Sequence, residues 1–247
     1  MRALVINKEN LENQRQAVKE ERRLSVDNQP YGLAGEKFDE MVYDNFAYHH
    51  SVIGSMADLD AASVEDVQQF FKTYYAPNNA VLALAGDLDT NDTLARVKKY
   101  FGGIPRQPAP KMPDLTEPAH NEERRASLED KLARVPRLDI GYRIPESNSA
   151  ETEALSVASA ILGAGDSSRL YQKLVKEKEV ATQAFSGIDT RVGTSEFGIS
   201  AMIRPGQDPH EVEKLISEEI ARLAAEPVTD KELAKARGVR DLQGRYC

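Results

Sequence analysis

The sequence predicts a protein of mixed helices and strands, of the α/β or α+β class. Three consecutive patterns support this: a helical pattern from Ser63 to Tyr75, the continuous apolar run AVLALAG from Ala80 to Gly86, and a second helical pattern from Asp89 to Tyr100. A helix, a buried strand and another helix in succession are typical of these two classes.

Local patterns in the first half of the chain predict two helices and a strand. A charged helix is expected over ENLENQRQAVKEERR, Glu9 to Arg23. In the next helix, Ser63 and Asp66 have the spacing of a capping box, and the apolar residues after them recur at helical intervals. The apolar run from Ala80 to Gly86 suits a strand that is covered on both faces.

A proline-rich segment separates the two halves. Prolines stand at positions 105, 108, 110, 113 and 118. Closely spaced prolines favour an extended, semi-rigid chain and cannot donate hydrogen bonds to a ladder. We therefore expect a first region over 1–104, a linker over 105–130 and a second region over 131–247.

The second half contains alternating and helical patterns. Strands are expected around Leu138 to Tyr142 and Phe197 to Ile203, where apolar residues alternate with polar ones or glycine. Helices are expected after four capping residues, and Gly163 is expected to end the first of these helices. The capping residues are Ser149, Ser167, Asp208 and Thr229.

Composition excludes several classes of protein. The 247 residues carry a net charge of -8, which argues against a surface for nucleic acid or anionic membranes. No apolar run approaches the roughly 18 residues of a membrane span, and the start does not resemble a signal peptide. The single cysteine, Cys247, excludes an intrachain disulfide and a cysteine metal site. Localisation, whether bacterial periplasm or cytoplasm, stays open.

Glu12 is the candidate metal ligand, and spacing alone does not select it. It is one charge on a highly charged helix, with Lys8 four residues before and Arg15 three residues after it. These neighbours would form weak ion pairs on a solvated helix face. From the helix alone, a surface role for Glu12 is the simpler interpretation.

The histidines do not supply a metal site. Four are present: the adjacent pair His49 and His50, then His120 and His210. No pair has the spacing that places two imidazoles on one helix face, and neither H-E-x-x-H nor H-x-x-E-H occurs. His120 and His210 are expected at the surface, and adjacent histidines could hold an adventitious ion.

The phrase GAGDSSRL, Gly163 to Leu170, invites comparison with a phosphate-binding loop. It lacks the G-K-[ST] ending, and a helix rather than a strand precedes it. A helix that ends at a glycine, followed by a helix with a serine cap, explains the same spacing.

Several phrases in a fixed order resemble the pitrilysin/insulinase family of zinc metallopeptidases, the inverzincins, and in particular bacterial relatives of the mitochondrial processing peptidase. They are the charged helix with Glu12, the phrase from Val52 to Leu88 that closes on Y-x-P-x-N and G-D, and the phrase ILGAGDSSRLYQKLVKEKEVAT from Ile161 to Thr182. The resemblance implies an α+β fold of two related domains, each a mainly antiparallel sheet with helices packed on one side, and both incomplete here.

The resemblance also implies a function. In the family, an H-x-x-E-H helix supplies two zinc-binding histidines and the catalytic glutamate, and a later helix supplies a third ligand, at the position of Glu12 here. H-x-x-E-H is expected before Met1, so this chain itself is expected to be inactive. The resemblance further places Gly163, Gly165 and Arg169 on the side of the peptide substrate.

One departure from the family pattern concerns a partner. Self-sufficient members carry an arginine and a tyrosine that hold the substrate, and the matching positions here are Val175 and Thr182. The resemblance therefore implies a homodimer or a heterodimer with a homologous subunit that bears the arginine and tyrosine. Two alternatives stay open: a non-catalytic structural or binding subunit of the same family, and a standalone binding module.

Overall fold

The computed structural model describes the backbone of residues 4–246 and the side chains of residues 4–238. The chain forms two compact units, each built from two stretches of sequence. Unit 1 comprises Met1–Leu24 and Val52–Asp114, and unit 2 comprises Ser25–Ser51 and Leu115–Cys247.

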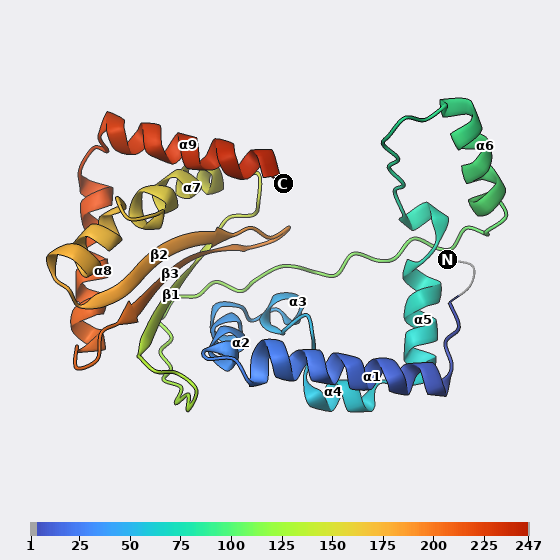
Figure 1. Cartoon of the computed structure of the whole chain (residues 1–247), viewed down its shortest axis with the longest axis horizontal. Helices are drawn as coiled ribbons and strands as arrows, with labels where there is room; N and C mark the ends of the chain where they lie inside the picture. Colours follow the sequence, from blue (N-terminus) through green and yellow to red (C-terminus); the bar gives the residue numbers. More distant parts are fainter. Residues whose placement is uncertain (1–3, 247) are drawn as a thin grey trace. The chain divides into compact units, whose positions relative to one another are not determined.

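Unit 1 is helical in the part of the chain that the structure describes. Its elements are α1 (Lys8–Arg22), α4 (Met56–Ala61), α5 (Val64–Tyr74), the 3-10 turn η2 (Pro77–Asn79) and α6 (Thr90–Phe101) (Figure 1). Local side chains fix the helix starts. Ser63 and Asp66 form the predicted capping box of α5, and Asp89 accepts a hydrogen bond from the backbone nitrogen of Asp92 at the start of α6. The three predicted helices of this region are therefore confirmed.

The predicted buried strand over Ala80 to Gly86 is wrong. This segment is extended but pairs with no strand among the described residues, and the Val81 side chain is 99% exposed. A strand with two apolar faces needs neighbours in its ladder and layers above and below it. Unit 1 provides neither, so the segment remains single.

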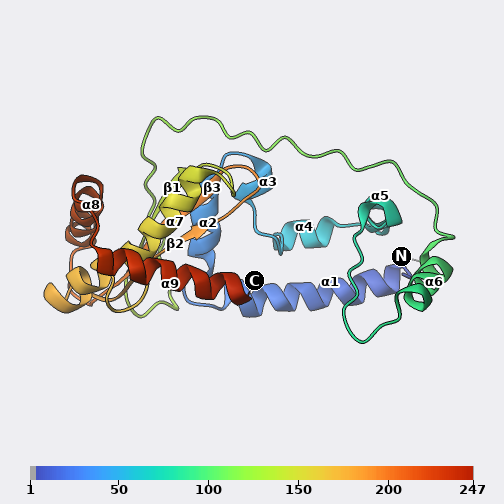
Figure 2. The same ribbon diagram turned by 90° about the horizontal axis from the view of Figure 1, so that it is seen from above.

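The proline-rich region contains no helix or strand in the described structure. The chain from the end of α6 at Phe101 to the start of β1 at Arg137 runs as an extended trace (Figure 2). Its second part belongs to unit 2 and is held there by ion pairs. Asp44 contacts His120 at 2.7 Å, Arg124 at 2.9 Å and Arg143 at 3.0 Å. His120, expected simply at the surface, is thus a paired residue that helps to fix the segment.

Unit 2 is built around a three-stranded antiparallel sheet. The strands are β1 (Arg137–Ile144), β2 (Ala181–Asp189) and β3 (Ser195–Ile203), in the order β1-β3-β2. Its helices include α7 (Ala150–Gly163), α8 (Pro209–Ala225) and α9 (Asp230–Tyr246), with the π-helical turn η3 (Tyr171–Glu177) after α7. The α+β class is therefore confirmed, although β2 was not predicted.

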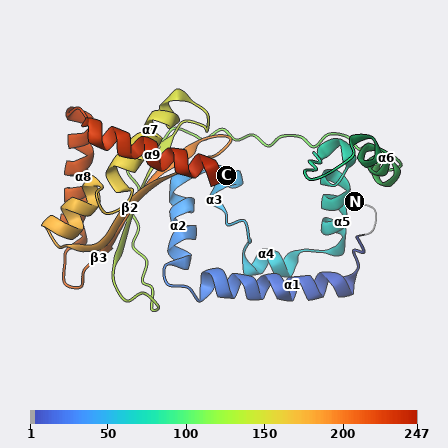
Figure 3. The same cartoon turned by 45° about the horizontal axis from the view of Figure 1, so that its top comes forward.

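The core of unit 2 lies between the sheet and the helices α7, α8 and η3. The alternation predicted for β3 is correct, and its inward-facing residues Phe197, Ile199, Ala201 and Ile203 are buried. Leu170 and Leu174 from the chain around η3, and Val212 and Ile216 from α8, pack against them. α7 and α9 lie together on this side of the strands (Figure 1, Figure 3).

One predicted helix end is confirmed and one predicted cap is wrong. Gly163 is the last residue of α7, but its role is close packing rather than a left-handed turn: a Cβ there would lie 2.0 Å from the backbone nitrogen of Ser186 on β2. Ser167 is exposed, and η3 begins without a side-chain cap. The caps at Ser149, Asp208 and Thr229 are confirmed by hydrogen bonds to the first turns of α7, α8 and α9.

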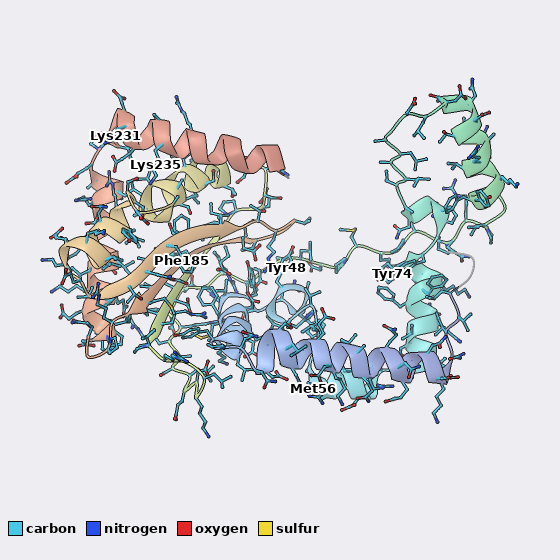
Figure 4. All side chains as sticks on the ribbon, viewed as in Figure 1. Tyr48, Met56, Tyr74, Phe185, Lys231 and Lys235 are labelled. Atoms are coloured by element: carbon cyan, nitrogen blue, oxygen red, sulfur yellow. The ribbon has the colours of Figure 1, made fainter. Side chains whose placement is uncertain are left out.

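The other face of the sheet carries α2 (Gly32–Val42), which was not predicted. Gly141 of β1 faces Phe38 and Val42, and a Cβ at Gly141 would lie less than 3 Å from both side chains. After α2, Tyr43 and Tyr48 form a small buried cluster with Val42; Tyr48 belongs to the short helix α3 (Phe46–His49) (Figure 4). The π-helical turn η1 (Arg23–Asp27) precedes α2 in the chain.

Candidate functional site

Glu12 lies on the exposed face of α1, where two neighbours on the same helix bind its carboxylate. Gln16 donates a hydrogen bond to Oε1 at 2.7 Å, and Arg15 donates to Oε2 at 3.1 Å. These hydrogen bonds, that from Gln16 first and that from Arg15 second, lower the pKa of Glu12. The carboxylate is therefore ionised and available, as a metal ligand must be.

Arg15 connects α1 to the end of α4. Its guanidinium donates hydrogen bonds to the backbone oxygens of Leu59, of Asp60 at 2.9 Å and of Ala62 at 2.9 Å. Carbonyls at a helix C-terminus lack partners in the helix and carry partial negative charge, so a guanidinium fits there. Arg15 thereby fixes the place of Glu12 in unit 1. The sequence indicated the Glu12–Arg15 pair but not the contact with α4, which depends on tertiary structure.

Among the residues that the structure describes, no three histidine, cysteine or carboxylate side chains lie close enough to hold a metal ion. A catalytic zinc needs three protein ligands and an open position. The described residues therefore do not form a zinc site by themselves. Glu12 supplies one carboxylate, and the remaining ligands would have to come from outside the described residues.

Apart from His120, the histidines pack against an aromatic ring or lie at the surface. The His49 and His50 rings both lie against Phe46, with ring centroids 5.6 Å and 4.4 Å from that of Phe46. His210 is exposed at the start of α8, as predicted.

The loop after α7 contains the three residues implied to face substrate. Gly163 is buried against β2, whereas Gly165 is exposed and has a positive φ of 70°. Arg169 is directed toward α9, where its Nε lies 2.7 Å from Oε1 of Glu232. The ion pair raises the pKa of Arg169 and lowers the pKa of Glu232 to about 2.

Glu232 was missed as a partner of Arg169. Its only signal in the sequence is its position three residues after Thr229, which indicates a helix start and not a long-range contact. Lys235 of α9 also donates a hydrogen bond to the backbone oxygen of Ala164. The loop is thus held in place by α9, and its residues Gly165 to Ser167 are open to solvent.

Val175 and Thr182, which stand where the family has an arginine and a tyrosine, differ in burial. Val175 is buried in the core of unit 2, where it contacts other apolar side chains. Thr182 lies at a β-bulge in β2, where the register with β3 shifts, and its side chain is exposed. Val175 cannot donate a hydrogen bond, and the Thr182 hydroxyl, which is shorter than a tyrosine, donates to the backbone oxygen of Met202 at 3.3 Å.

No helix among the described residues is both long enough and apolar enough to cross a membrane. This agrees with the absence of a long apolar run in the sequence.

Comparison with known proteins identifies the family. Residues 61–239 match the family described as "Peptidase M16 inactive domain". Glu12 lies before this matched region, but similarity to individual relatives includes the first half of the chain. A zinc protease of Helicobacter pylori, PqqE, is 30% identical over 224 residues, which are 90% of this chain and 50% of that protein.

Further relatives and solved structures agree. A zinc protease of Mycobacterium leprae is 28% identical over 86% of this chain and 48% of its own length. The crystal structure of a protease from H. pylori superimposes with a TM-score of 0.88 at 28% identity, over 98% of this chain and 59% of that one. A peptidase M16 inactive domain from Pseudomonas fluorescens has the same fold, with a TM-score of 0.74 at 21% identity, over 96% of this chain and 56% of that one.

The chain spans about half the length of the curated relatives it matches. The match to this family extends over most of the chain, and it agrees with the family that the ordered phrases of the sequence resemble. The chain therefore belongs to the peptidase M16 family, the pitrilysin/insulinase family of zinc proteases.

Proposed function

We propose that this chain is part of a zinc-dependent endopeptidase subunit that hydrolyses peptides or unfolded polypeptides, and that it cleaves no peptide bond on its own. The observation that supports this most is its similarity to the H. pylori zinc protease over 90% of the chain. The absence of a three-ligand cluster among the described residues supports the second half of the proposal.

Glu12 is the metal ligand that this chain contributes. Its carboxylate is exposed and is oriented by Arg15 and Gln16 on a helix that α4 holds in place. The other ligands belong to an H-x-x-E-H helix in a longer form of the protein. In the same form, regions 1–104 and 131–247 are parts of two related domains.

The first experiment uses the chain as it stands. Titration with zinc in a calorimeter should show no stoichiometric binding tighter than micromolar, and a fluorogenic peptide should not be cleaved, since one carboxylate is a single ligand where three are needed. Submicromolar binding at one equivalent, with activity that a chelator removes, would contradict the proposal.

The second experiment uses a longer form that contains H-x-x-E-H. Glu12→Gln should lower its zinc content and its peptidase activity because the neutral amide is a poorer ligand of nearly the same shape. Glu21→Gln is the matched control: nine residues on, Glu21 lies on the opposite side of the same helix. Equal zinc content in both variants would leave Glu12 as a surface residue.

The loop after α7 faces the substrate in this proposal. Gly163 allows the loop to approach β2, Gly165 is exposed, and Arg169 is anchored by Glu232. Replacing Gly165 by alanine in the longer form should raise KM more than it changes kcat, because the loop would contact peptide and not the reacting atoms.

A partner subunit completes the activity. Buried Val175 and exposed Thr182 stand where self-sufficient members of the family have the arginine and tyrosine. We therefore expect the longer form alone to be weakly active, and a homologous subunit with both residues to raise its activity by about 10²–10³ for each donor gained. Full activity in a preparation that contains a single subunit would contradict this.

A non-catalytic structural or binding subunit of the same family is the alternative. It predicts that a longer form lacks H-x-x-E-H and contains no zinc. Metal analysis of that form by mass spectrometry distinguishes the two functions.

A further inference from the structure

The sheet of unit 2 carries a row of three glycines across its strands. Gly141 of β1 pairs with Gly198 of β3, and Gly198 pairs with Gly187 of β2. Gly198 lies on the face opposite the core, because Phe197 before it points into the core and side chains alternate along a strand. Gly141 and Gly187, which pair with Gly198, lie on the same face. Because glycine has no side chain, the row leaves a band of bare backbone across this face of the sheet.

Helix α2 fills one end of this band and leaves the rest open. Phe38 and Val42 occupy the space above Gly141. No atom lies within 4 Å of a Cβ built on Gly187, and a Cβ on Gly198 would approach one atom, Oε1 of Glu196, at 3.1 Å. A glycine in a strand often marks a place where a ligand or another backbone comes close.

The open part of the band is a cavity of about 340 Å³ within unit 2, in the size range of ligand pockets. Its apolar lining includes the rings of Phe38 from α2 and Phe185 from β2 (Figure 4 labels Phe185). The carboxylates of Glu196 and Asp189, which lie side by side on paired strands, also line it. The cavity therefore combines an apolar channel with a charged end.

Glu196 is the acid without a partner. It is 7% exposed, and no described residue forms an ion pair or hydrogen bond with its carboxylate. Its two cross-strand neighbours are committed elsewhere. Arg143 binds Asp44 and Glu117, each at 3.0 Å, and Asp189 binds Arg191 at 2.5 Å.

The surrounding charges do not compensate Glu196. The carboxylates near it outnumber the guanidinium groups that line the cavity or lie beside it. The carboxylates are Asp39, Asp139, Asp189 and Glu196 itself, and the guanidinium groups are Arg137, Arg143 and Arg191. Arg137 is paired with Asp139 at 2.7 Å. The hydroxyl of Tyr43, close to the same acids, is buried and has no hydrogen-bond partner among the described residues.

A buried carboxylate without a cation is costly, and a cation that enters with an apolar stem would remove that cost. We propose that this cavity binds the side chain of a lysine or arginine from a peptide, with the methylene stem over Gly187 and Gly198 beside Phe185 and the charged end at Glu196. The proposal rests on the proposed function only for the source of the peptide, a polypeptide substrate. Binding itself requires neither zinc nor a partner subunit.

The state of Glu196 makes the binding depend on pH. Burial, and then the negative charges of Asp39 and Asp189, raise the pKa of Glu196 to about 7, while Arg191 opposes them. A bound cation favours the ionised form. The other groups that face Glu196 are Tyr43 after α2 and Asp139 and Arg143 on β1. Binding should therefore be strong at pH 8 and weak at pH 5.5.

The test is a titration of the nitrogen-15-labelled chain, followed by NMR amide shifts. The probes are the acetylated and amidated pentapeptides Ala-Ala-Lys-Ala-Ala and its norleucine counterpart, which has an uncharged side chain of similar shape. At pH 8 the lysine peptide should shift amides of β2 and β3 around Gly187 and Gly198 and bind about tenfold tighter or more than the norleucine peptide, since its ammonium group gains a charged hydrogen bond.

Variants locate the effect. Glu196→Gln should reduce the lysine peptide to the affinity of the norleucine peptide, and Gly187→Leu should abolish binding of both by filling the cavity. Glu218→Gln, at an exposed site on α8, is the control and should bind as the unchanged chain does.

Equal affinity of the unchanged chain for the two peptides at pH 8 would overturn the proposal, and so would unchanged lysine affinity in Glu196→Gln. Neither result depends on peptidase activity. A longer form without activity but with intact lysine binding would refute the proposed function and not this site.

Discussion

The two units of the chain differ in what their apolar residues contact. In unit 2, apolar residues from β3, α8 and the chain around η3 are fully buried in one core. In unit 1, Ala76 is the single buried apolar side chain among those described, and many large residues of α5, α6 and the segment after η2 are exposed. Figure 4 shows one of them, Tyr74 on α5, which is 43% exposed.

An amphipathic pattern lets a helix form, but it does not supply the surface against which the apolar face of that helix packs. The helices of unit 1 have good caps and apolar stripes, so they form. Helical stability in proteins comes mostly from packing of the apolar face, however, and the described residues of unit 1 form no sheet against which the helices could pack. Burial of apolar surface contributes roughly 25 cal/mol per Å², and in this chain that contribution is concentrated in unit 2.

The largest expected difference is between matched leucine truncations. Leu174→Ala removes a side chain that is 0% exposed in the core of unit 2, and should lower the free energy of unfolding by about 2–5 kcal/mol. Leu82→Ala removes a side chain that is 54% exposed in unit 1 and should leave the unfolding transition in place. Urea denaturation followed by circular dichroism measures both. Similar losses would mean that unit 1 has a core of its own.

The next effect is a pH dependence confined to unit 2. The pKa of Glu196 is about 7 in the folded unit and about 4.5 in the unfolded chain. Between pH 4.5 and pH 7, therefore, the folded unit keeps a proton on Glu196 that the unfolded chain has released. Stability should therefore decrease as pH rises from about 4.5 to 7, by up to about 3 kcal/mol. Glu196→Gln should flatten this slope. In unit 1, the shifted acids Glu12, Asp60 and Asp66 all have lowered pKa values and cannot produce it.

Measurement of the unfolding free energy at pH 5 and pH 7.5, in the unchanged chain and in Glu196→Gln, checks this sign. A stability that rises over the window in the unchanged chain would be incompatible with the buried, unpaired state of Glu196.

A smaller effect tests the contact between helix and sheet in unit 2. Gly163→Ala would place a Cβ 2.0 Å from the nitrogen of Ser186 and should cost about 1–3 kcal/mol as α7 shifts away from β2. Gly187→Ala is the matched control, since nothing lies within 4 Å of its Cβ. A thermal midpoint lowered equally by both substitutions would show that helix packing is not the cause.

The parts of the fold that depend on nearby residues could be predicted from the sequence. The caps at Ser63, Ser149 and Asp208, and the alternation in β3, require only a few neighbouring side chains. The strand predicted after Pro77 failed because a strand also requires partners distant in the sequence. The close-packing role of Gly163 was missed for the same reason.

The candidate site divides in the same way. Glu12 was found through a resemblance, and its pair with Arg15 through helical spacing. The glycine row could not be predicted, because Gly141, Gly187 and Gly198 come together only through the register of three strands. Glu196 had one local signal, a charge within an otherwise apolar or small-residue strand, and that signal does not show whether a cation lies opposite it.

Hydrogen–deuterium exchange of backbone amides, resolved by mass spectrometry, compares the two units most directly. Amides of β3, paired on both edges within unit 2, should be protected to nearly the full stability of that unit, whereas amides from Ala80 to Leu88 should exchange at the rate of an open chain. Comparable protection in the two segments would contradict the account, because residues 80–88 would then belong to a ladder within this chain.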